Sequence, residues 1–365
     1  MFELSFFPLG NADTTRIVTP VGRRLLFDFA PLVSSDAEFD LEEELRADLR
    51  KARRTGFDVV CITHLDDDHC RRFEEVFHLD HSAAHQGAGR LRIDTLWVPA
   101  AAVVETDLAL ESAKRVQREA RHRLKAGHGV VVFSAPDTLE DWLRGQGIDP
   151  ASRAHCIRHA GDLVPGWALK GDDIEFFVHA PLSWRQGDTV VRNADSVVLQ
   201  AVMRVGGSDT RMMLGADVDS ADLTEIVKST RRHENHDRLN WDILKLFHHC
   251  SYKALNRDDR GGVETVPVPE VADLIERHGA ARSVIVSPSC PIPARLSVEG
   301  DLPPHRQAAN YYNRIQDGRG GRFKVTMDTA ERPITVRVSG GGASIVPALA
   351  APALAASVRK PARAG

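Results

Sequence analysis

The sequence lacks the features of a membrane-spanning or exported protein. No window approaches the roughly 18 apolar residues that a membrane-spanning helix needs. Residues 1–15 have neither the positively charged start nor the long apolar core of a signal peptide. The five cysteines are an odd number at irregular spacings, unlike the disulfide framework of a small secreted protein. These absences predict a cytoplasmic protein in a reducing compartment, with no membrane partner.

The chain also lacks an excess of positive charge. It has 47 Lys and Arg against 51 Asp and Glu, and its formal net charge is −4. A global basic field of the kind that non-specific nucleic-acid binding needs is therefore excluded, so any nucleic-acid contact would depend on a local patch. What is present is a globular composition, because 365 residues that are 42% hydrophobic and 27% charged can bury a substantial core.

A strand-then-helix rhythm occurs twice along the chain. Residues 2–29 read as a β-meander, and a helix at 41–54 leads into a buried strand at 58–62. The second half repeats this rhythm, with strands expected at 174–179, 196–204, 210–215, 243–247 and 283–287 and helices at 219–231 and 268–278. The rhythm favours an α/β fold in which two mixed sheets pack face to face and helices cover them outside, an αββα sandwich.

One large domain is expected over residues 1–340. Helical patterns at 105–125 and 136–145 are predicted to form an insertion on its surface, at about 100–150. Residues 341–365 are rich in Ala, Pro and Gly and have no apolar periodicity, so they are predicted to form a flexible tail.

The most informative run is residues 61–69, in which an apolar strand ends at imidazoles and carboxylates. His64 and Asp66 can face one cation, while Asp68 and His69 open the next helix and can face a second. Zinc accepts this mixture of nitrogen and oxygen ligands. The alternative is an acidic helix N-terminus that only satisfies free backbone N–H groups, but such a cap does not need two histidines.

Two later strands also end in potential ligands. Residues 212–217 end at Asp217, and residues 243–249 end at the pair His248 and His249. Taken singly, Asp217 could cap the following helix, and either histidine could be an ordinary half-buried residue. Because three strands deliver ligands at their C-terminal ends, the set favours a centre for two divalent ions, zinc or alternatively manganese. His248 is the preferred ligand of the pair, since it ends the strand directly.

These motifs resemble the metallo-β-lactamase superfamily, and specifically the hydrolase domain of ComEC-like DNA-uptake proteins and their stand-alone relatives. The resemblance covers residues 2–315. Residues 64–69 match the form His-x-Asp-x-Asp-His, and residues 245–251 resemble Lys-x-x-His-His-Gly-Ser. Residues 215–217 resemble a strand that ends in Gly-Asp, with one inserted residue.

The opening segment is similar to the first hairpin of that family, with Asp13 in the loop and Asp28 ending the third strand. The sequence departs from the family at Cys70, where a small or aliphatic residue is usual, and at Cys250, where glycine is usual. No histidine stands at the usual third-motif position. The candidates for that role are Asn193, Asp195, His179 or water.

The resemblance implies a metallo-β-lactamase sandwich whose two metal ions share Asp217 as a bridging carboxylate and activate a water for hydrolysis. It implies His305 as a residue that contacts substrate or protonates a leaving group. The predicted metal ligands are His64, Asp66, Asp68, His69, Asp217, His248 and His249, and the predicted catalytic residues are Asp68, Asp217 and His305.

The expected substrate is anionic, a phosphodiester in a nucleic acid or a nucleotide-derived compound. Arg71, Arg72, Lys253 and Arg306 would give the site a basic rim that suits such a substrate. Two alternatives stay open: a hydrolase of a lactone, thioester or phosphocholine ester, and a binding or scaffold protein with a structural or vestigial metal site.

Overall fold

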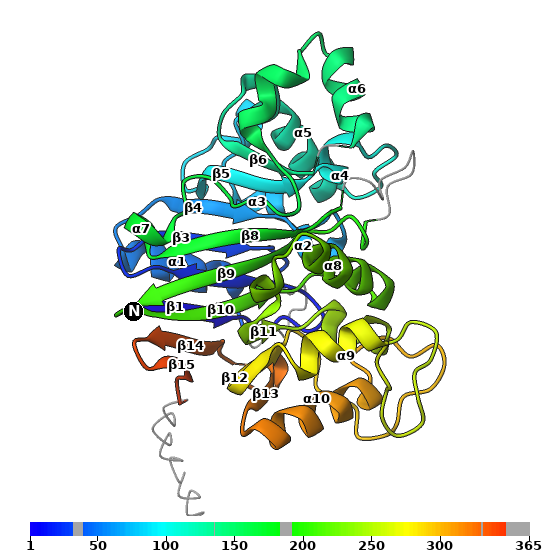
Figure 1. Ribbon diagram of the computed structural model, residues 1–365. Coiled ribbons are helices and arrows are strands. Elements are labelled where there is room, and N and C mark those ends of the chain that lie inside the picture. Colours follow the sequence, from blue (N-terminus) through cyan, green and yellow to red (C-terminus); the bar gives the residue numbers. More distant parts are fainter. Residues whose placement is uncertain (32–38, 135, 183–191, 330, 348–365) are drawn as a thin grey trace, which may run out of the picture.

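A nine-stranded sheet forms one of the two central layers of the computed structural model (Figure 1). The structure describes residues 1–31, 39–134, 136–182, 192–329 and 331–347. In spatial order the strands of this sheet are β15 (Gly342–Ile345), β14 (Ile334–Ser339), β1 (Phe2–Phe6), β2 (Thr15–Val18), β3 (Arg24–Phe27), β4 (Gly56–Cys61), β5 (Arg92–Pro99), β6 (Val130–Phe133) and β7 (Ile157–Arg158). From β3 to β7 neighbouring strands are parallel, whereas those from β15 to β3 are antiparallel.

A six-stranded sheet forms the second central layer. In spatial order its strands are β13 (Arg322–Val325), β12 (Gly279–Ser287), β11 (Trp241–Lys245), β10 (Ser208–Leu214), β9 (Val198–Val205) and β8 (Ile174–Ala180). The strands from β10 to β13 are parallel neighbours, and β8, β9 and β10 are antiparallel. Each sheet therefore has a parallel part, whose strands end at one common edge.

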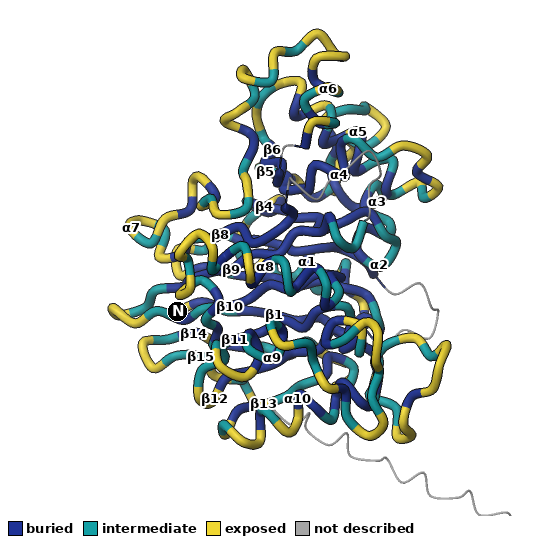
Figure 2. The backbone as a smooth tube through the Cα atoms, turned by 45° about the vertical axis from the view of Figure 1, so that its right-hand side comes forward, coloured by how far each residue is buried: buried dark blue, intermediate teal, exposed yellow. Residues whose placement is uncertain are grey.

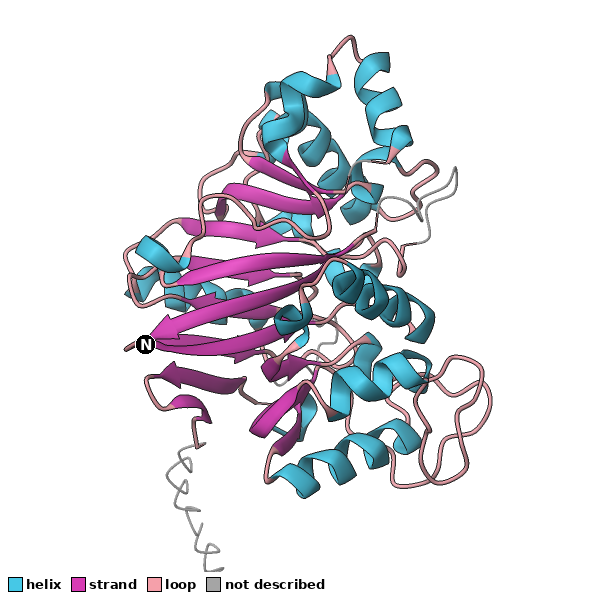
Figure 3. Cartoon of the chain, viewed as in Figure 1, coloured by secondary structure: helices cyan, strands magenta, loops and turns pink. Residues whose placement is uncertain are grey.

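Helices cover the outer faces of both sheets, as the cyan elements around the magenta strands of Figure 3 show. The nine-stranded sheet is covered by α1 (Leu41–Lys51), α3 (Phe73–Val76), α4 (Ala101–Val104), α5 (Glu111–Ala126) and α6 (Asp137–Gly145). The six-stranded sheet is covered by α8 (Ser220–Arg232), α9 (Pro269–Glu276) and α10 (Arg306–Arg319). The predicted αββα layering is confirmed.

Alternation along the strands produces three apolar layers. In β4, Val59 and Cys61 pack between the sheets, while Val60, which lies between them in the sequence, packs beneath the helices. In β11 the neighbours Ile243 and Leu244 divide in the same way. Both sheets are thus buried on two faces along their central strands, which are mostly dark blue in Figure 2. A rigid double sheet results, and its strand ends can hold side chains in fixed positions.

The segment predicted as a helical insertion is joined to the sandwich more closely than expected. Its helices α4, α5 and α6 do lie on the surface, but β6 runs between α5 and α6 and extends the nine-stranded sheet. Val131 and Phe133 of β6 pack between the sheets, whereas Val130 and Val132 pack beneath the helices. Two-sided burial of this short apolar run explains why it is a strand.

The C-terminal tail begins later than the composition suggested. Residues 342–345 were predicted to be flexible, but they form β15, which pairs antiparallel with β14. Ala343 and Ile345 also pack against the core between the sheets. The rest of the predicted tail, residues 348–365, lies outside the described residues. No helix in the described part of the chain is long and apolar enough to cross a membrane.

Candidate metal centre

The parallel parts of the two sheets deliver polar side chains to the same edge of the sandwich. β3 and β4 are in register at Phe27 and Cys61, so Asp28 and the 63–69 segment leave the sheet side by side. β10 and β11 are in register at Leu214 and Lys245, so Asp217 and the paired histidines also leave together. The sheets pack face to face, and the two sets of side chains therefore meet.

Four side chains form the centre of this meeting point. Ligand atoms of Asp68, His69, Asp217 and His249 all lie within 4.8 Å of one another. His249 Nε2 is 3.2 Å from Asp217 Oδ2 and 3.3 Å from Asp68 Oδ2. His69 Nε2 is 3.6 Å from Asp217 Oδ1. All but Asp68 are buried, so water screens these charges poorly.

Two more predicted ligands lie directly beside this cluster. The ring of His64 is 3.8 Å from that of His69, measured between centroids, and its Nε2 is 3.7 Å from Asp66 Oδ2. The other oxygen of Asp66 binds Arg192, which also pairs with Glu105. No local pattern in the sequence marks Arg192, because its contacts join segments far apart in the chain.

The Nδ1 atoms of two histidines are fixed as donors by their partners. His69 Nδ1–H donates to Asp28 Oδ2 over 2.9 Å, and His249 Nδ1–H donates to the Pro288 carbonyl over 2.8 Å. Neither acceptor can donate in return. In the neutral ring Nε2 then carries a lone pair, which is the arrangement that second-sphere acceptors impose on metal-binding histidines.

His64 follows the same pattern through a hydroxyl group. Thr63 Oγ1 donates to Asp28 and therefore accepts from His64 Nδ1–H, over 3.2 Å. Several atoms that face the cluster are left buried without a hydrogen-bond partner among the described residues. They are Nε2 of His64, His69 and His249 and Oδ1 of Asp217. Such orphaned lone pairs repel one another unless positive charge lies between them, so the donor set fits divalent cations.

The electrostatics of the cluster point the same way. Burial alone would lower the pKa of His249, but Asp217 and Asp68 outweigh it and raise that pKa to about 10. Burial would likewise raise the pKa of Asp217, yet His249 and His69 hold it well below its usual range. Burial and the neighbouring His69 lower the pKa of His64 to about 4. Positive charge at this point therefore stabilises the ionised carboxylates, and a metal ion would supply it.

A buried ion pair supports the cluster from below. Lys245 Nζ lies 2.6 Å from Asp13 Oδ2 and also donates to the Gly215 carbonyl. The Asp13 N–H in turn donates to the Asp68 carbonyl over 2.9 Å. These contacts tie the opening hairpin to β11 and to the turn that carries Asp68, so they fix the positions of ligands in both sheets.

The geometry reverses the preference between the paired histidines. His248, His249 and Cys250 all have positive φ values, of 47°, 51° and 62°. This left-handed turn points His249 into the cluster and leaves His248 half-buried at its edge. The geometry therefore favours His249, and not the expected His248, as the ligand. Three successive non-glycine residues in this conformation are costly, and strain of this kind is found mainly at functional sites.

His305 has a structural position and does not point at the cluster. It is 2% exposed, and its Nδ1 accepts from the Tyr252 N–H over 3.3 Å. Its Nε2–H donates to the Asp301 carbonyl over 3.0 Å. Both ring nitrogens are thus occupied in holding the turn before α10, which contradicts the predicted catalytic role.

The candidates for the third-motif position differ in where they lie. His179 makes its contacts beneath α8 and not at the metal centre. Its ring nitrogens pair with Thr230 Oγ1 at 3.2 Å and with the Arg238 carbonyl at 3.0 Å. Residues 193–197 do lie beside the centre, since the Val197 N–H donates to the Thr63 carbonyl. Asp195 is buried there but does not join the groupings of ligand atoms among the described residues.

Two of the four residues of the predicted basic rim are paired with carboxylates. Arg71 pairs with Asp67 at 2.5 Å, and Arg72 pairs with Glu75 at 2.7 Å. Arg306 donates through Nε to the Pro293 carbonyl. Arg71 and Arg72 therefore add less positive charge to the site than the sequence suggested, whereas a carbonyl partner leaves the charge of Arg306 in place.

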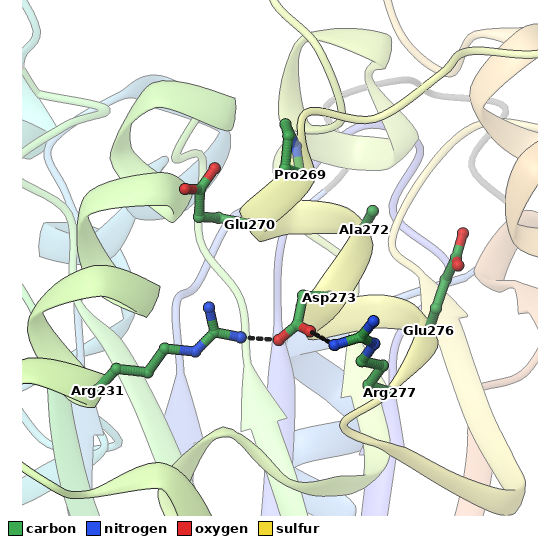
Figure 4. Close-up of a pocket in the computed structure, with 7 residues that line it drawn as sticks. All are labelled: Arg231, Pro269, Glu270, Ala272, Asp273, Glu276 and Arg277. Carbon is green, nitrogen blue, oxygen red and sulfur yellow. Dashed lines mark hydrogen bonds and ion pairs between the residues drawn. The ribbon is translucent and has the colours of Figure 1, made fainter.

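A hollow of about 350 Å³ between α8 and α9 lies apart from this centre (Figure 4). Asp273 projects into it from α9 and binds both Arg231 of α8 and Arg277, as the dashed lines show. Glu270 and Glu276 also line it. Because both arginines of the hollow already pair with Asp273, we interpret it as part of the packing of the two helices.

No protein-family model matches this chain, and no curated protein sequence matches it. Among solved structures, a diphosphatase of the PhnP family matches with 10% identity and a TM-score of 0.31, over 78% of this chain and 86% of that one. The class B3 di-zinc metallo-β-lactamase LRA-12 from an Alaskan soil metagenome matches with 11% identity and a TM-score of 0.34, over 73% and 85%. The metallo-β-lactamase GOB-18 from Elizabethkingia meningoseptica matches with 13% identity and a TM-score of 0.32, over 87% and 89%. Matches at this level do not identify a function, which has to come from the geometry of the site.

Proposed function

We propose that this protein is a hydrolase that uses two divalent metal ions, zinc or manganese, to cleave a phosphodiester. One observation carries the proposal. Three buried imidazoles present partnerless Nε2 atoms to the buried carboxylate of Asp217 and to the half-buried carboxylates beside it, at the point where both sheets end. A proton could balance part of this charge, but a set that combines several histidines with several carboxylates is the ligand set of a metallohydrolase.

The proposed ligands are His64, Asp66, Asp68, His69, Asp217 and His249. We propose Asp217 as the bridging carboxylate, because its two oxygens face different histidines, Oδ1 toward His69 and Oδ2 toward His249. When bound, divalent ions lower the pKa of coordinated water toward neutrality and stabilise negative charge at the attacked centre.

The chain's own residues orient this site. Asp28 accepts from the Thr63 N–H at 2.7 Å, from Thr63 Oγ1 at 2.9 Å and from His69 at 2.9 Å, so it fixes two histidines at once. The Pro288 carbonyl fixes the third, His249. The site thus keeps its nitrogen lone pairs directed inward before any ligand arrives, and little reorganisation is needed on binding.

The substrate class follows from the charge of such a centre. Two divalent ions favour an anionic ester, and the sequence motifs resemble the DNA-uptake branch of hydrolases, whose substrate is a phosphodiester. A nucleic acid or a nucleotide-derived compound would fit. A non-catalytic metal protein is the second candidate, and Arg192 favours it, because its guanidinium already neutralises one proposed ligand, Asp66.

Metal content and substrate class are tested together. Protein purified without chelator is expected to hold about two divalent ions per chain by elemental analysis, since six ligands exceed what one tetrahedral ion uses. It is then assayed on bis(p-nitrophenyl) phosphate, on a lactone and on a thioester. Consistent absence of transition metal would refute the proposal. Two bound ions without turnover of any substrate would favour the non-catalytic candidate.

A further inference from the structure

A second hollow, of about 430 Å³, lies on the helix-covered side of the nine-stranded sheet. It is bounded by α1, by the start of β5 and by the loop before β5. Leu49, Ala88 and Leu91 give it an apolar part. None of the described residues that line it is acidic, and five of them are arginines: Arg46, Arg50, Arg54, Arg90 and Arg92.

Carboxylates outside the hollow neutralise only some of this charge. Arg46 pairs with Glu42 at 2.8 Å, Arg50 with Glu43 at 2.5 Å and Arg54 with Asp58 at 2.6 Å. A guanidinium has five N–H donors, and each of these carboxylates occupies one or two of them.

The other two arginines have no carboxylate partner in the described chain. Arg90 donates to the carbonyls of Phe77 and Glu74, which leaves its charge uncompensated. Arg92 is exposed at the start of β5. The hollow therefore retains net positive charge after these three ion pairs are counted, which distinguishes it from the hollow between α8 and α9.

Solvated arginines at the end of a helix are the simpler explanation, since Arg50 lies in the last turn of α1. Two contacts argue against it. Arg46 Nη1 donates across the hollow to the Gly89 carbonyl over 2.6 Å, and Arg90 Nη1 donates to the Phe77 carbonyl over 3.0 Å. These guanidinium groups are held in place, so less side-chain entropy is lost when an anion binds them.

The hollow is separate from the metal centre. It borders the start of β4 and β5, whereas the metal centre follows the end of β4. At about 3.3 Å per residue, the length of β4 alone places the two sites about 20 Å apart. An anion in the hollow would therefore not touch the metal ligands.

We propose that this hollow binds a small molecule that carries two or more phosphate groups and has the size of a nucleotide. Guanidinium groups bind phosphate through paired N–H donors, and several of them converge here. The volume is within the range of small-ligand pockets, and the two leucines can contact a sugar or a base. A nucleic-acid duplex is too wide to enter it.

Calorimetric titration of the full chain tests this proposal with pyrophosphate, ADP, AMP and adenosine. Pyrophosphate and ADP are expected to bind, AMP more weakly, and adenosine not at all. Arg92→Glu and Arg50→Glu are expected to weaken ADP binding about tenfold or more, because each removes charge-assisted hydrogen bonds and adds repulsion. Arg118→Glu, an exposed arginine on α5, makes the same charge change outside the hollow and is expected to leave binding unchanged.

Three results would overturn the proposal. The first is that millimolar pyrophosphate and ADP neither bind nor change the melting temperature, which would mean that the arginines are ordinary solvated surface residues. Binding that Arg92→Glu does not alter would place the anion at the metal centre instead. Tighter binding of a single-stranded oligonucleotide than of ADP, lost in Arg92→Glu, would identify a nucleic-acid contact rather than a small-molecule site.

Discussion

The paired histidines offer a sharp test of the site, because two adjacent residues of the same type are expected to behave differently. His249 Nε2 lies 3.2 Å and 3.3 Å from two carboxylates, whereas His248 lies outside the grouping of ligand atoms. His249→Ala should therefore release metal and abolish hydrolysis. His248→Ala should keep the metal and lose turnover at most.

The magnitude follows from the number of ligands. A zinc site with four protein ligands binds with about 12 kcal/mol, so one ligand contributes about 3 kcal/mol if the ligands share this equally. At about 1.4 kcal/mol for each factor of ten, losing His249 should weaken metal binding about a hundredfold. The loss is larger if the Asp217 carboxylate, buried opposite that ring, is left without a counter-charge.

Competition with a chromophoric chelator measures this affinity for both variants and the parent protein, and circular dichroism confirms that each variant is folded. Equal loss of metal in the two variants, or loss only in His248→Ala, would show that the left-handed turn does not select the ligand as the structure indicates.

Four further outcomes are expected. Asp217→Asn should lower metal content and activity more than Asp66→Asn, measured by elemental analysis and turnover, because it removes charge from the shared ligand; an Asp217→Asn protein with both ions and normal activity would exclude bridging. Asp28→Asn should weaken metal binding about 10- to 100-fold with little change in KM, since it disturbs the orientation of His69. Burial lowers the pKa of His179 to about 4, so the fold holds this side chain in its neutral form. The free energy of unfolding should therefore fall by up to about 3 kcal/mol as the pH falls from about 6.5 toward 4. In urea unfolding, the free energy of His179→Gln should depend less steeply on pH over this range than that of the parent protein. Truncation after residue 347 should leave the melting temperature unchanged, whereas truncation after 340 should lower it by a few degrees through loss of β15.

The strand ends could be predicted because their signals are local. An apolar run that ends at histidine or aspartate indicates both a strand and a candidate ligand. This pattern predicted His64, His69 and Asp217 as ligands from the sequence. The same reasoning gave the layered fold, since strand and helix periods alternate in both halves. Polar residues interrupt the alternation within β5, so the sequence pattern does not indicate this strand, although two further strands lie between it and the edge of the sheet.

The contacts that orient the ligands could not be predicted, because they join distant parts of the chain. The Pro288 carbonyl beneath His249 and the Arg192 guanidinium on Asp66 have no local signature. The choice between His248 and His249 depended on positive φ values, which backbone propensities disfavour for these residue types.

The arrangement of the ligands also bears on how the molecule holds together. Asp68 and His69 follow β4 of the nine-stranded sheet, whereas Asp217 follows β10 and His249 follows β11 of the six-stranded one. An ion bound by these four residues would link the two sheets directly. Removal of the metal is then expected to weaken the contact between the two sheets before either sheet unfolds. The rate of proteolysis at this contact should therefore increase on metal loss while the secondary structure is still intact.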